Sequence, residues 1–149
     1  MQDTTAYLRP VTEKDIDLLY EWANDEKVRA NAFSTEQIPY ADHKRWFAAR
    51  LQDKDSRIYI YTYGDKPIGQ IRISMEDDVA TIDYSIDANF RRQGHGKKMI
   101  IQLEQIVKEQ FPRIKSLVAQ VKSENIASRS VFVAEKYEEE YVTYHKKLR

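Results

Sequence analysis

Three segments in the middle of the chain alternate between two sets of side chains. Short polar turns at 64–67 and 76–78 separate these segments, which span 57–63, 68–75 and 79–86. In the first segment Ile58 and Ile60 fall on one face, and the tyrosines fall on the other. A period of two residues, interrupted by turn residues, is typical of consecutive antiparallel strands. The pattern therefore predicts a three-stranded meander.

Other segments repeat their apolar residues at the spacing of one helix face. The first predicted helix starts at Thr12 or Asp15 and ends near Asn24, and the second spans 41–52. The third runs from the glycines at 94 and 96 to 111–112, and the fourth spans 125–135. Further strands are expected at 5–9, 116–121 and 137–148. The stretch 25–40 is polar and is expected to be irregular.

The order of these elements predicts the fold class. A helix joins the strand at 79–86 to the strand at 116–121, so the two are expected to be parallel neighbours. We therefore expect one domain over residues 1–149, of mixed α/β class. Its central twisted sheet combines an antiparallel meander with a parallel βαβ pair and is flanked by about four helices.

Composition narrows the possible partners. Lys plus Arg equals Asp plus Glu at 24 each, so net charge gives no argument for a nucleic-acid or membrane partner. Cysteine is absent, the three histidines lack metal-ligand spacing, and no apolar run reaches membrane-spanning length. The first residues do not resemble a signal peptide. We expect a cytoplasmic protein, a monomer or homodimer, without metal.

A basic turn with two of the four glycines follows the third strand of the meander. Gly94 and Gly96 precede the predicted helix, and Lys97 and Lys98 lie in its first turn, where the helix dipole disfavours cations. Backbone N–H groups and a helix N-terminus suit an anion such as a pyrophosphate. The alternative is an ordinary strand-to-helix turn with a solvated basic patch. The spacing fits neither a Walker loop nor a dinucleotide fingerprint.

Two motifs resemble the GNAT superfamily of N-acetyltransferases. Arg91-x-x-Gly94-x-Gly96 resembles its acetyl-coenzyme A signature, Gln/Arg-x-x-Gly-x-Gly/Ala. The preceding residues 86–90 resemble the lead-in to that signature, with Ala88 in place of proline. Residues 125–137 resemble the second signature, Asn-x-x-Ala/Ser-x-x-x-Tyr/Phe-x-x-x-Gly-Phe. The resemblance covers nearly the whole chain and implies a GNAT fold with acetyl-coenzyme A as cofactor.

The resemblance also implies which residues bind the cofactor. The backbone around Gln93, Gly94, His95, Gly96 and Lys97 would hold the pyrophosphate, and Arg91 and Arg92 would add side-chain charge. The strand edge at Ser85 and Ile86 would pair with the pantetheine arm, and Asn125 would contact that arm from the other side. Ser128, Arg129 and Phe132 are the other implied cofactor contacts. Asn125 is at the same time a good helix cap.

The catalytic residues are less clear from the motifs. Many relatives carry a tyrosine acid at the position of Phe132, and phenylalanine cannot donate a proton. Tyr137 and Tyr141 are possible substitutes or simply core and sheet residues. Asp83 is the best-placed carboxylate for a base, unless it lies on a solvated sheet face. His43 could also serve, or could be a partly exposed helix histidine.

The acceptor side resembles one branch of the superfamily. Residues 22–29 followed by 31–33 and 43–47 resemble amino-sugar N-acetyltransferases of pseudaminic and legionaminic acid pathways. The resemblance implies an acetyl transfer to a nucleotide-linked small-molecule amine and substrate roles for Asn24, Arg29, Asn31 and Trp46. These residues could instead order the loop or the core. Gln120 stands where the ribosomal-protein acetyltransferases carry a catalytic Glu. Protein N-terminal or lysine acetylation, and a catalytically silent acyl-coenzyme A-binding module, stay open as alternatives.

Overall fold

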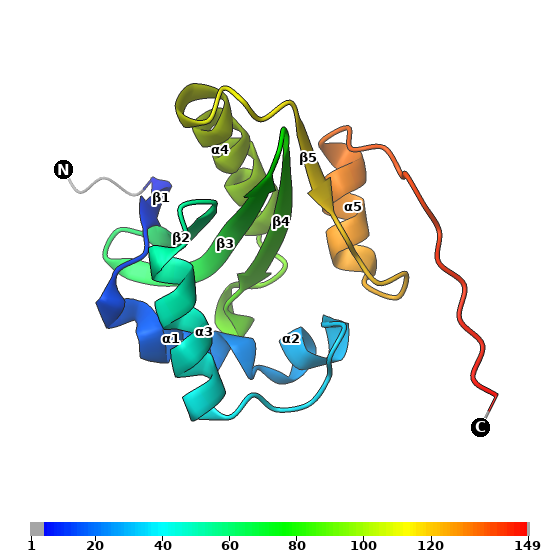
Figure 1. Cartoon of the computed structure of the whole chain (residues 1–149), viewed down its shortest axis with the longest axis horizontal. Coiled ribbons are helices and arrows are strands. Elements are labelled where there is room, and N and C mark those ends of the chain that lie inside the picture. The colour runs from blue at the N-terminus through cyan, green and yellow to red at the C-terminus, as the bar shows by residue number, and fades with distance from the viewer. Residues whose placement is uncertain (1–4, 149) are drawn as a thin grey trace.

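The computed structural model describes residues 5–148, which form a five-stranded sheet flanked by helices (Figure 1). The strands are β1 (Ala6–Pro10), β2 (Ser56–Tyr63), β3 (Lys66–Glu76), β4 (Val79–Ile86) and β5 (Ser116–Ala119), in that spatial order. The α-helices are α1 (Ile16–Ala23), α2 (Glu26–Asn31), α3 (Tyr40–Gln52), α4 (His95–Gln110) and α5 (Ile126–Ala134). Two short 3-10 turns, η1 (Glu13–Asp15) and η2 (Ala88–Phe90), precede α1 and α4.

The sheet has the predicted mixed topology. Strands β1 to β4 pair antiparallel in sequence order, and β4 pairs with β5 in parallel through the α4 crossover. The parallel ladder begins at Val79 opposite Ser116 and ends at Ile82 opposite Ala119. β5 is therefore two residues shorter than the predicted strand 116–121. None of the described helices is both long and apolar enough to span a membrane.

The two faces of β2 carry different cores, as the alternation predicts. Ile58 and Ile60 pack with Leu19, Trp22 and Phe47 of α1 and α3. On the opposite face Tyr59 and Tyr61 join the larger core, which includes apolar residues of β3 and β4, the buried face of α4, and Phe132, whereas Tyr63 at the end of β2 is exposed. In Figure 1, α3 lies in front of the sheet and α4 behind it. The hydrophobic effect thus fixes both helical layers on one central strand.

The face of the sheet that α1 and α3 cover becomes polar beyond β2. The register places Gln70 beside Ile60 and Arg72 beside Ile58. On β4, Ser85 lies opposite Gln70, and Asp83 lies opposite Arg72. Because α1 and α3 pack over the isoleucines of β2, this polar stripe on β3 and β4 faces a cleft instead of a core. The stripe defines the floor of that cleft.

A partly buried ion pair joins β1 to the start of α1. Both carboxylate oxygens of Asp15 accept from the Arg9 guanidinium at 2.8 Å, and one of them also accepts from the Thr12 N–H at 2.8 Å. Asp15 is only 6% exposed. Bonding to Arg9 lowers the pKa of Asp15, burial opposes that shift, and the Thr12 N–H adds to it, so the pKa lies below its usual value.

Two segments differ from the sequence-based expectation. The stretch 25–40, expected to be irregular, contains the six-residue helix α2. No residue of α2 is buried, so apolar periodicity could not reveal it; the Asp25 side chain stabilises it by accepting from the N–H groups of Lys27 and Val28 at 3.1 and 3.2 Å.

The second difference is the segment 137–148, for which a closing strand was expected. It forms no strand and runs away from the sheet beyond α5, with most of its side chains exposed (Figure 1). The segment has the side-chain pattern of a strand, but it contains three consecutive glutamates at 138–140. Their charged side chains are more stable in water than packed along the edge of the short β5. A lone strand without a pairing partner is not stable.

The Arg9–Asp15 pair gives the first testable prediction. Asp15→Ala leaves the guanidinium without its buried partner, and we expect the free energy of unfolding to fall by about 3 kcal/mol in urea titrations at pH 7. Arg45→Ala is the control, because Arg45 is 73% exposed in its ion pair with Asp42 and should cost less than about 1 kcal/mol.

The same pair should also affect stability in acid. The folded pKa of Asp15 is depressed, so its contribution is present above the unfolded pKa of about 4 and is lost as pH falls through the folded pKa. The difference in stability between the parent and Asp15→Ala should shrink below about pH 4. A difference that stays constant down to pH 2 would exclude this role for Asp15.

Candidate functional site

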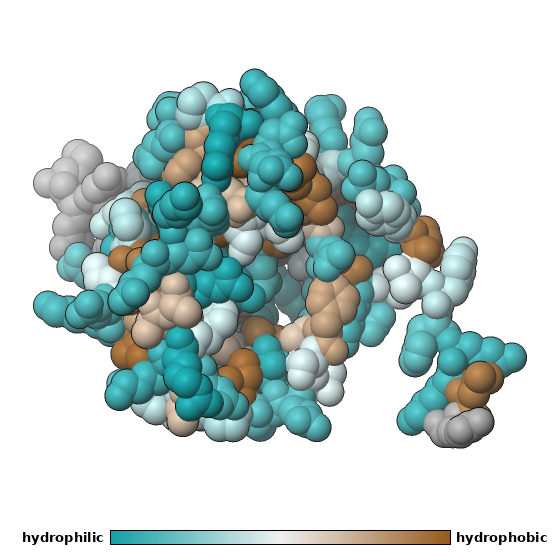
Figure 2. All heavy atoms as spheres, viewed as in Figure 1, coloured by the Kyte–Doolittle hydropathy of each residue, from teal (hydrophilic) through white to brown (hydrophobic). Residues whose placement is uncertain are grey.

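The separation of β4 from β5 opens the main cleft of the molecule. Beyond Ile82 and Ala119 the two strands no longer pair, and α4 and α5 begin on either side of the gap. The cleft has a volume of about 1180 Å³ and extends from this gap to α1, α2 and α3. Figure 2 views this hollowed face, between the α3 side and the α5 side of the molecule. One continuous cavity therefore joins residues expected to bind the cofactor with residues expected to bind the acceptor.

Two residues of β4 turn their backbone groups toward the gap. The Asp87 N–H donates to the Ile68 carbonyl on the β3 side, and the Lys115 N–H donates to the Asp78 carbonyl on the β5 side. Hydrogen-bonding direction alternates along a strand. The N–H and C=O groups of Tyr84 and Ile86 therefore face the gap, and those of Ser85 face β3.

The free edge of β4 thus consists of Tyr84 and Ile86, whereas Ser85 and Ile86 were expected to form it. Ile86 was expected there, and Tyr84 was not singled out from the sequence. Ser85 lines the cleft through its side chain, whose hydroxyl accepts from the Gln70 amide at 3.1 Å. Knowing the direction of the hydrogen bonds at Asp78 or Asp87 would have identified Tyr84, but no residue pattern carries that information.

The start of α4 forms one wall of the gap. Gly94 caps the helix with φ of +81°, in the left-handed region where glycine is favoured. The first N–H groups of a helix lack carbonyl partners within it, and the positive end of the helix dipole lies there. Gly94, Gly96 and Lys97 line the cleft, whereas Gln93 is exposed and does not. The geometry suits an anion.

His95 and Gly96 make this turn compact. The Nδ1 atom of His95 is buried and has no hydrogen-bond partner among the described residues. Burial lowers the pKa of His95, and nearby Lys98 lowers it further, so the ring is neutral at pH 7. A Cβ added at Gly96 would lie 3.3 Å from the Tyr84 ring, which shows how closely the turn approaches β4. A ligand or a water molecule in the cleft would supply the missing hydrogen-bond partner of His95 Nδ1.

The start of α5 forms the opposite wall. Asn125 caps this helix, and its side-chain oxygen accepts from the Ser128 N–H at 3.3 Å. The Ser128 hydroxyl contacts the Tyr84 hydroxyl at 3.0 Å, so a polar pair spans the gap between β4 and α5. Burial raises the pKa of Tyr84, and the Ser128 bond opposes that shift. Arg129 instead points to solvent and donates to the Ser123 carbonyl at 2.9 Å.

Phe132 lies where the cleft meets the larger core. It is 8% exposed, lines the cleft, and contacts the Tyr84 ring edge-on at 6.0 Å between centroids. Tyr137 packs behind it at 5.0 Å and does not line the cleft, and Tyr141 is exposed in the tail. The Tyr137 hydroxyl is buried without a partner in the described chain, and burial raises its pKa. The structure therefore does not bring Tyr137 to the reaction space.

The acceptor end of the cleft is built around Trp46. The Arg50 guanidinium lies 5.9 Å and the Arg72 guanidinium 5.0 Å from the centroid of the Trp46 ring. Arg72 also pairs with Asp83 at 2.5 Å, and the Asp83 side chain is 56% exposed. Asp83 is thus on the polar floor of the cleft and reaches solvent there. Trp46 itself is half-buried against the α1–α3 core and presents its remaining surface to the cleft.

The other predicted acceptor residues order the loop around α2. The Asn24 side chain donates to the Ile38 carbonyl at 3.0 Å and accepts from the Ile38 N–H at 2.7 Å, and it does not line the cleft. Arg29 lines the cleft, but it also donates to the carbonyls of Ala23 and Ser34 at 2.6 and 3.0 Å. Asn31 lines the cleft as well. Burial lowers the pKa of Arg29, Asp83 opposes this shift, and Arg72 adds to it.

His43 lies in the core between α1 and α3 and differs from the expected partly exposed histidine. It is 3% exposed, stacks on Phe47, and its Nε2 lies 2.9 Å from the Ile16 carbonyl oxygen. A carbonyl only accepts, so Nε2 carries the proton and only Nδ1 could accept one. The ring borders the cleft, but it is packed among Tyr20, Trp46 and Phe47. The sequence could not show this burial because it depends on the packing of α1 against α3.

Cations dominate the lining of the cleft although the whole chain is neutral. Seven Lys and Arg side chains line it, against three carboxylates: Lys27, Arg29, Arg50, Arg72, Arg91, Arg92 and Lys97, with Asp42, Asp83 and Glu124. Both clear sites of positive charge, the start of α4 and the surroundings of Trp46, belong to this one cavity. No group of acidic, histidine or cysteine side chains in the described residues could hold a metal ion. The cleft therefore suits anionic ligands.

Comparisons with known proteins agree with this geometry. The sequence matches the family described as "Acetyltransferase (GNAT) domain" over residues 6–136. Among curated proteins, none matches the sequence. A possible acetyltransferase from Clostridium difficile 630 is similar in structure, with a TM-score of 0.75 and 18% identity, over 97% of this chain and 98% of that one.

Two further similar structures were solved as complexes. Spermidine N-acetyltransferase from Vibrio cholerae, solved with coenzyme A and spermine, has a TM-score of 0.83 and 13% identity, over 93% of this chain and 84% of that one. The aminoglycoside acetyltransferase AAC(6')-Ib, solved with coenzyme A, has a TM-score of 0.79 and 20% identity, over 91% of this chain and 86% of that one. At these identities the likeness concerns the fold.

Two left-handed glycines offer a matched test of the α4 turn. Gly94 and Gly64 both have positive φ and open space where a Cβ would lie. Replacing either with alanine should cost about 1 kcal/mol of stability through backbone strain. Only Gly94→Ala should weaken coenzyme A binding in calorimetry, by about tenfold or more, because Gly64 lies in the β2–β3 turn. Equal loss of affinity in both variants would contradict the α4 site.

Proposed function

The chain belongs to the GNAT family of N-acetyltransferases, and we propose that it acetylates the primary amine of a nucleotide-linked amino sugar. The observation that carries this proposal is the continuity of the cleft. It joins an anion site at the start of α4 to a cationic chamber around Trp46, with the unpaired edge of β4 between them.

The described residues fit acetyl-coenzyme A in the first half of the cleft. The N–H groups at the start of α4, with Arg92 and Lys97 nearby, suit its diphosphate. The gap-facing N–H and C=O groups of Tyr84 and the N–H of Ile86 suit an extended amide-bearing arm that pairs as an added strand would, while the Ile86 carbonyl already accepts from Arg91 Nε. When bound, acetyl-coenzyme A supplies an activated acetyl group as a thioester.

The charge of the second half of the cleft favours an anionic acceptor. Arg50 and Arg72 flank the indole of Trp46, and Arg29 and Lys27 line the same end. Guanidinium groups bind phosphate with paired, charge-assisted hydrogen bonds, and an indole offers a face for stacking a base. A nucleotide diphosphate with an amino sugar combines all three requirements: phosphate charge, a planar ring and an amine.

Polycationic and peptide acceptors fit this chamber less well. Spermine, which was solved in complex with the Vibrio cholerae enzyme, is a polyamine, and such a cation needs uncompensated carboxylates. Asp25 and Asp83 are both held in ion pairs with arginine, and Glu21 does not line the cleft. An acidic groove for a protein N-terminus or lysine is therefore not formed by these three residues.

Asp83 is the proposed base for the incoming amine. It lies on the polar floor beside Arg72, lines the cleft, and its side chain is 56% exposed. Its carboxylate can take the amine proton directly or through a water, while Arg72 holds its orientation. We assign no catalytic role to His43, whose Nε2 donates to a carbonyl, or to Tyr137, which lies behind Phe132.

An amine panel tests the acceptor class. Thiol release from acetyl-coenzyme A should be faster with a nucleotide-linked amino sugar than with the same free sugar, spermine or a peptide N-terminus, by about 100-fold in kcat/KM. Arg50→Gln should raise the KM for the nucleotide-linked sugar about tenfold and leave that for the free sugar unchanged. Lys44→Gln is the control, because Lys44 lies on the same helix, is exposed and does not line the cleft.

Other results would replace this proposal. Fastest turnover with spermine would assign the chamber to polyamines despite its charge, and fastest turnover with the peptide would favour protein acetylation. Binding of acetyl-coenzyme A without thiol release for any amine would favour a silent binding module.

The role of Asp83 has its own test. Asp83→Asn keeps the shape and the hydrogen bond to Arg72 but removes the base, so kcat should fall about 100-fold with little change in either KM. The deficit should narrow at high pH, where the amine arrives already neutral. Glu124→Gln, which removes another carboxylate from the cleft lining, should leave kcat near the parent value. An unchanged kcat in Asp83→Asn would show that another group or bulk water takes the proton.

A further inference from the structure

We propose that Arg91 positions the acceptor side of the cleft and does not bind the diphosphate. The motif at 91–96 had suggested that Arg91 and Arg92 add charge to the same anion site, but their contacts differ. The inference rests on the proposed acetyl transfer only in requiring that both substrates meet in this cleft. Its consequence is that one residue of the cofactor motif controls the affinity for the acceptor.

The guanidinium of Arg91 is already committed on two sides. Its Nη2 atom pairs with Asp25 Oδ2 at 2.6 Å, and its Nε atom donates to the Ile86 carbonyl at 3.1 Å. The side chains of Arg91 and Asp25 are only 24% and 23% exposed. A partly buried, charge-assisted pair is stronger than a surface pair. Arg91 therefore links the unpaired edge of β4 to a residue 66 positions earlier in the chain.

Asp25 is the residue on which α2 depends. The same oxygen that meets Arg91 also accepts from the N–H groups of Lys27 and Val28. The combined hydrogen bonds outweigh the effect of burial, so the pKa of Asp25 lies below its usual value. α2 buries none of its residues and so has no hydrophobic anchor. Polar contacts at its ends must fix its position.

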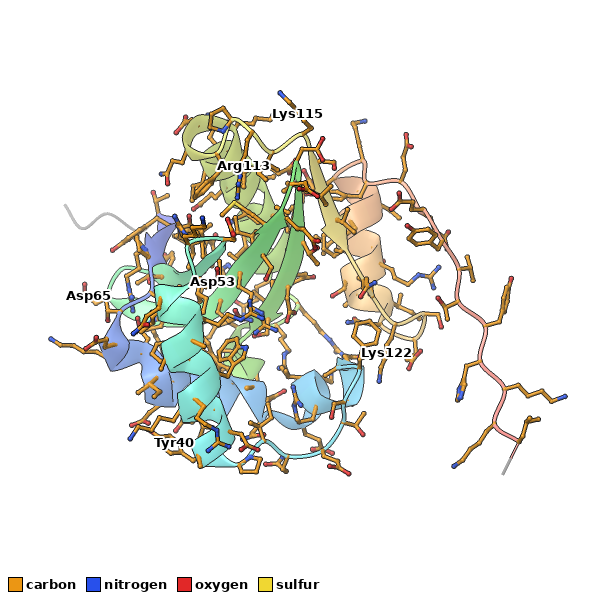
Figure 3. All side chains as sticks on the ribbon, in the orientation of Figure 1. Tyr40, Asp53, Asp65, Arg113, Lys115 and Lys122 are labelled. Atoms are coloured by element: carbon orange, nitrogen blue, oxygen red, sulfur yellow. The ribbon has the colours of Figure 1, made fainter. Side chains whose placement is uncertain are left out.

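Other polar contacts hold the same region, but they differ in kind. Trp22 Nε1 donates to Asp87 Oδ2 at 2.9 Å and holds α1 against the turn after β4. Lys122, labelled in Figure 3, lies beside the end of α2, and its Nζ donates to the Ala30 carbonyl at 3.1 Å. The first is a neutral donor and the second is exposed. The Arg91–Asp25 pair is thus the ion pair at the start of α2.

The position of α2 matters because it lines the acceptor chamber. Lys27, Val28, Arg29 and Asn31 all face the cleft from this helix. If the helix shifts, the cationic side chains of the chamber shift with it. The anion site at α4 lies on a different element and keeps its own backbone geometry, which Gly94 determines.

The neighbouring residue Arg92 has different contacts from Arg91. It is exposed, lines the cleft, and makes no ion pair among the described residues. Its φ of +63° is in the left-handed region, so the backbone of Arg92 differs from the extended backbone of Arg91. Of the two arginines, Arg92 has the guanidinium available to a diphosphate.

Four single variants and one double variant, which combines Asp25→Asn with Arg91→Gln, test the assignment. Asp25→Asn keeps a side-chain oxygen for the cap of α2 but removes the negative charge that Arg91 meets. Arg91→Gln removes the cation, and Arg91→Lys keeps charge without the two-sided geometry. Arg92→Gln removes the adjacent cation. Both KM values and kcat are measured with whichever amine the enzyme acetylates, and coenzyme A affinity is measured by calorimetry.

We expect opposite effects from the two arginines. Arg91→Gln and Asp25→Asn should each raise the acceptor KM about three- to tenfold, and coenzyme A affinity should change less than twofold. The combined variant should be no worse than either alone, because they share one interaction. Arg91→Lys should restore part of the acceptor KM. Arg92→Gln should weaken coenzyme A about three- to tenfold and leave the acceptor KM unchanged.

The opposite pattern would overturn the proposal. Loss of coenzyme A affinity in Arg91→Gln equal to that in Arg92→Gln, with a normal acceptor KM in Asp25→Asn, would make Arg91 a diphosphate ligand. This test does not depend on the proposed acceptor class, because the variants are compared with any amine that the enzyme acetylates. If no amine is turned over, the rate of hydrogen exchange at amides 26–31 decides between the two roles. That rate should rise in Arg91→Gln and not in Arg92→Gln. Equal exchange rates in the two variants would refute the proposed link between Arg91 and α2.

Discussion

The end of pairing between β4 and β5 is the constraint on which the site depends. Backbone N–H and C=O groups rarely stay without partners inside a protein. Beyond Ile82, however, the β5 side of β4 has no neighbouring strand. The Ile86 carbonyl accepts from Arg91 Nε, so water or a ligand must meet the remaining groups, which are the N–H and C=O of Tyr84 and the N–H of Ile86. Because the α4 turn and the cap of α5 border the same opening, a ligand that pairs with this edge also reaches a helix N-terminus.

The second requirement is the change in polarity along one face of the sheet. Ile58 and Ile60 are covered by α1 and α3, while the residues beside them on β3 and β4 are Gln70, Arg72, Asp83 and Ser85. Covering those polar groups with apolar side chains would cost several kcal/mol each. The helices therefore pack on β2 alone and leave a chamber over β3 and β4. The same alternation that builds the core thus also leaves space for a substrate.

Local patterns in the sequence were sufficient for the sheet and the cofactor turn. Side-chain alternation is set by the strand itself, and the left-handed cap at Gly94 needs glycine, so both are readable without knowledge of distant residues. Three features depend on distant partners: His43 is buried by α1, α2 needs the Asp25–Arg91 pair, and the segment 137–148 lacks a pairing partner. Periodicity carries no information on any of them.

Neutral net charge and a cationic cleft are compatible because charge matters at the scale of the site. Exposed charges separated by more than about 10 Å are largely screened, whereas Arg50, Arg72 and Trp46 lie within a few ångströms of one another. Their field acts on a ligand inside the cleft and hardly at all on one outside it. Balanced surface charge therefore argues against a large polyanion as partner and leaves a small phosphorylated acceptor as the ligand that this chamber suits.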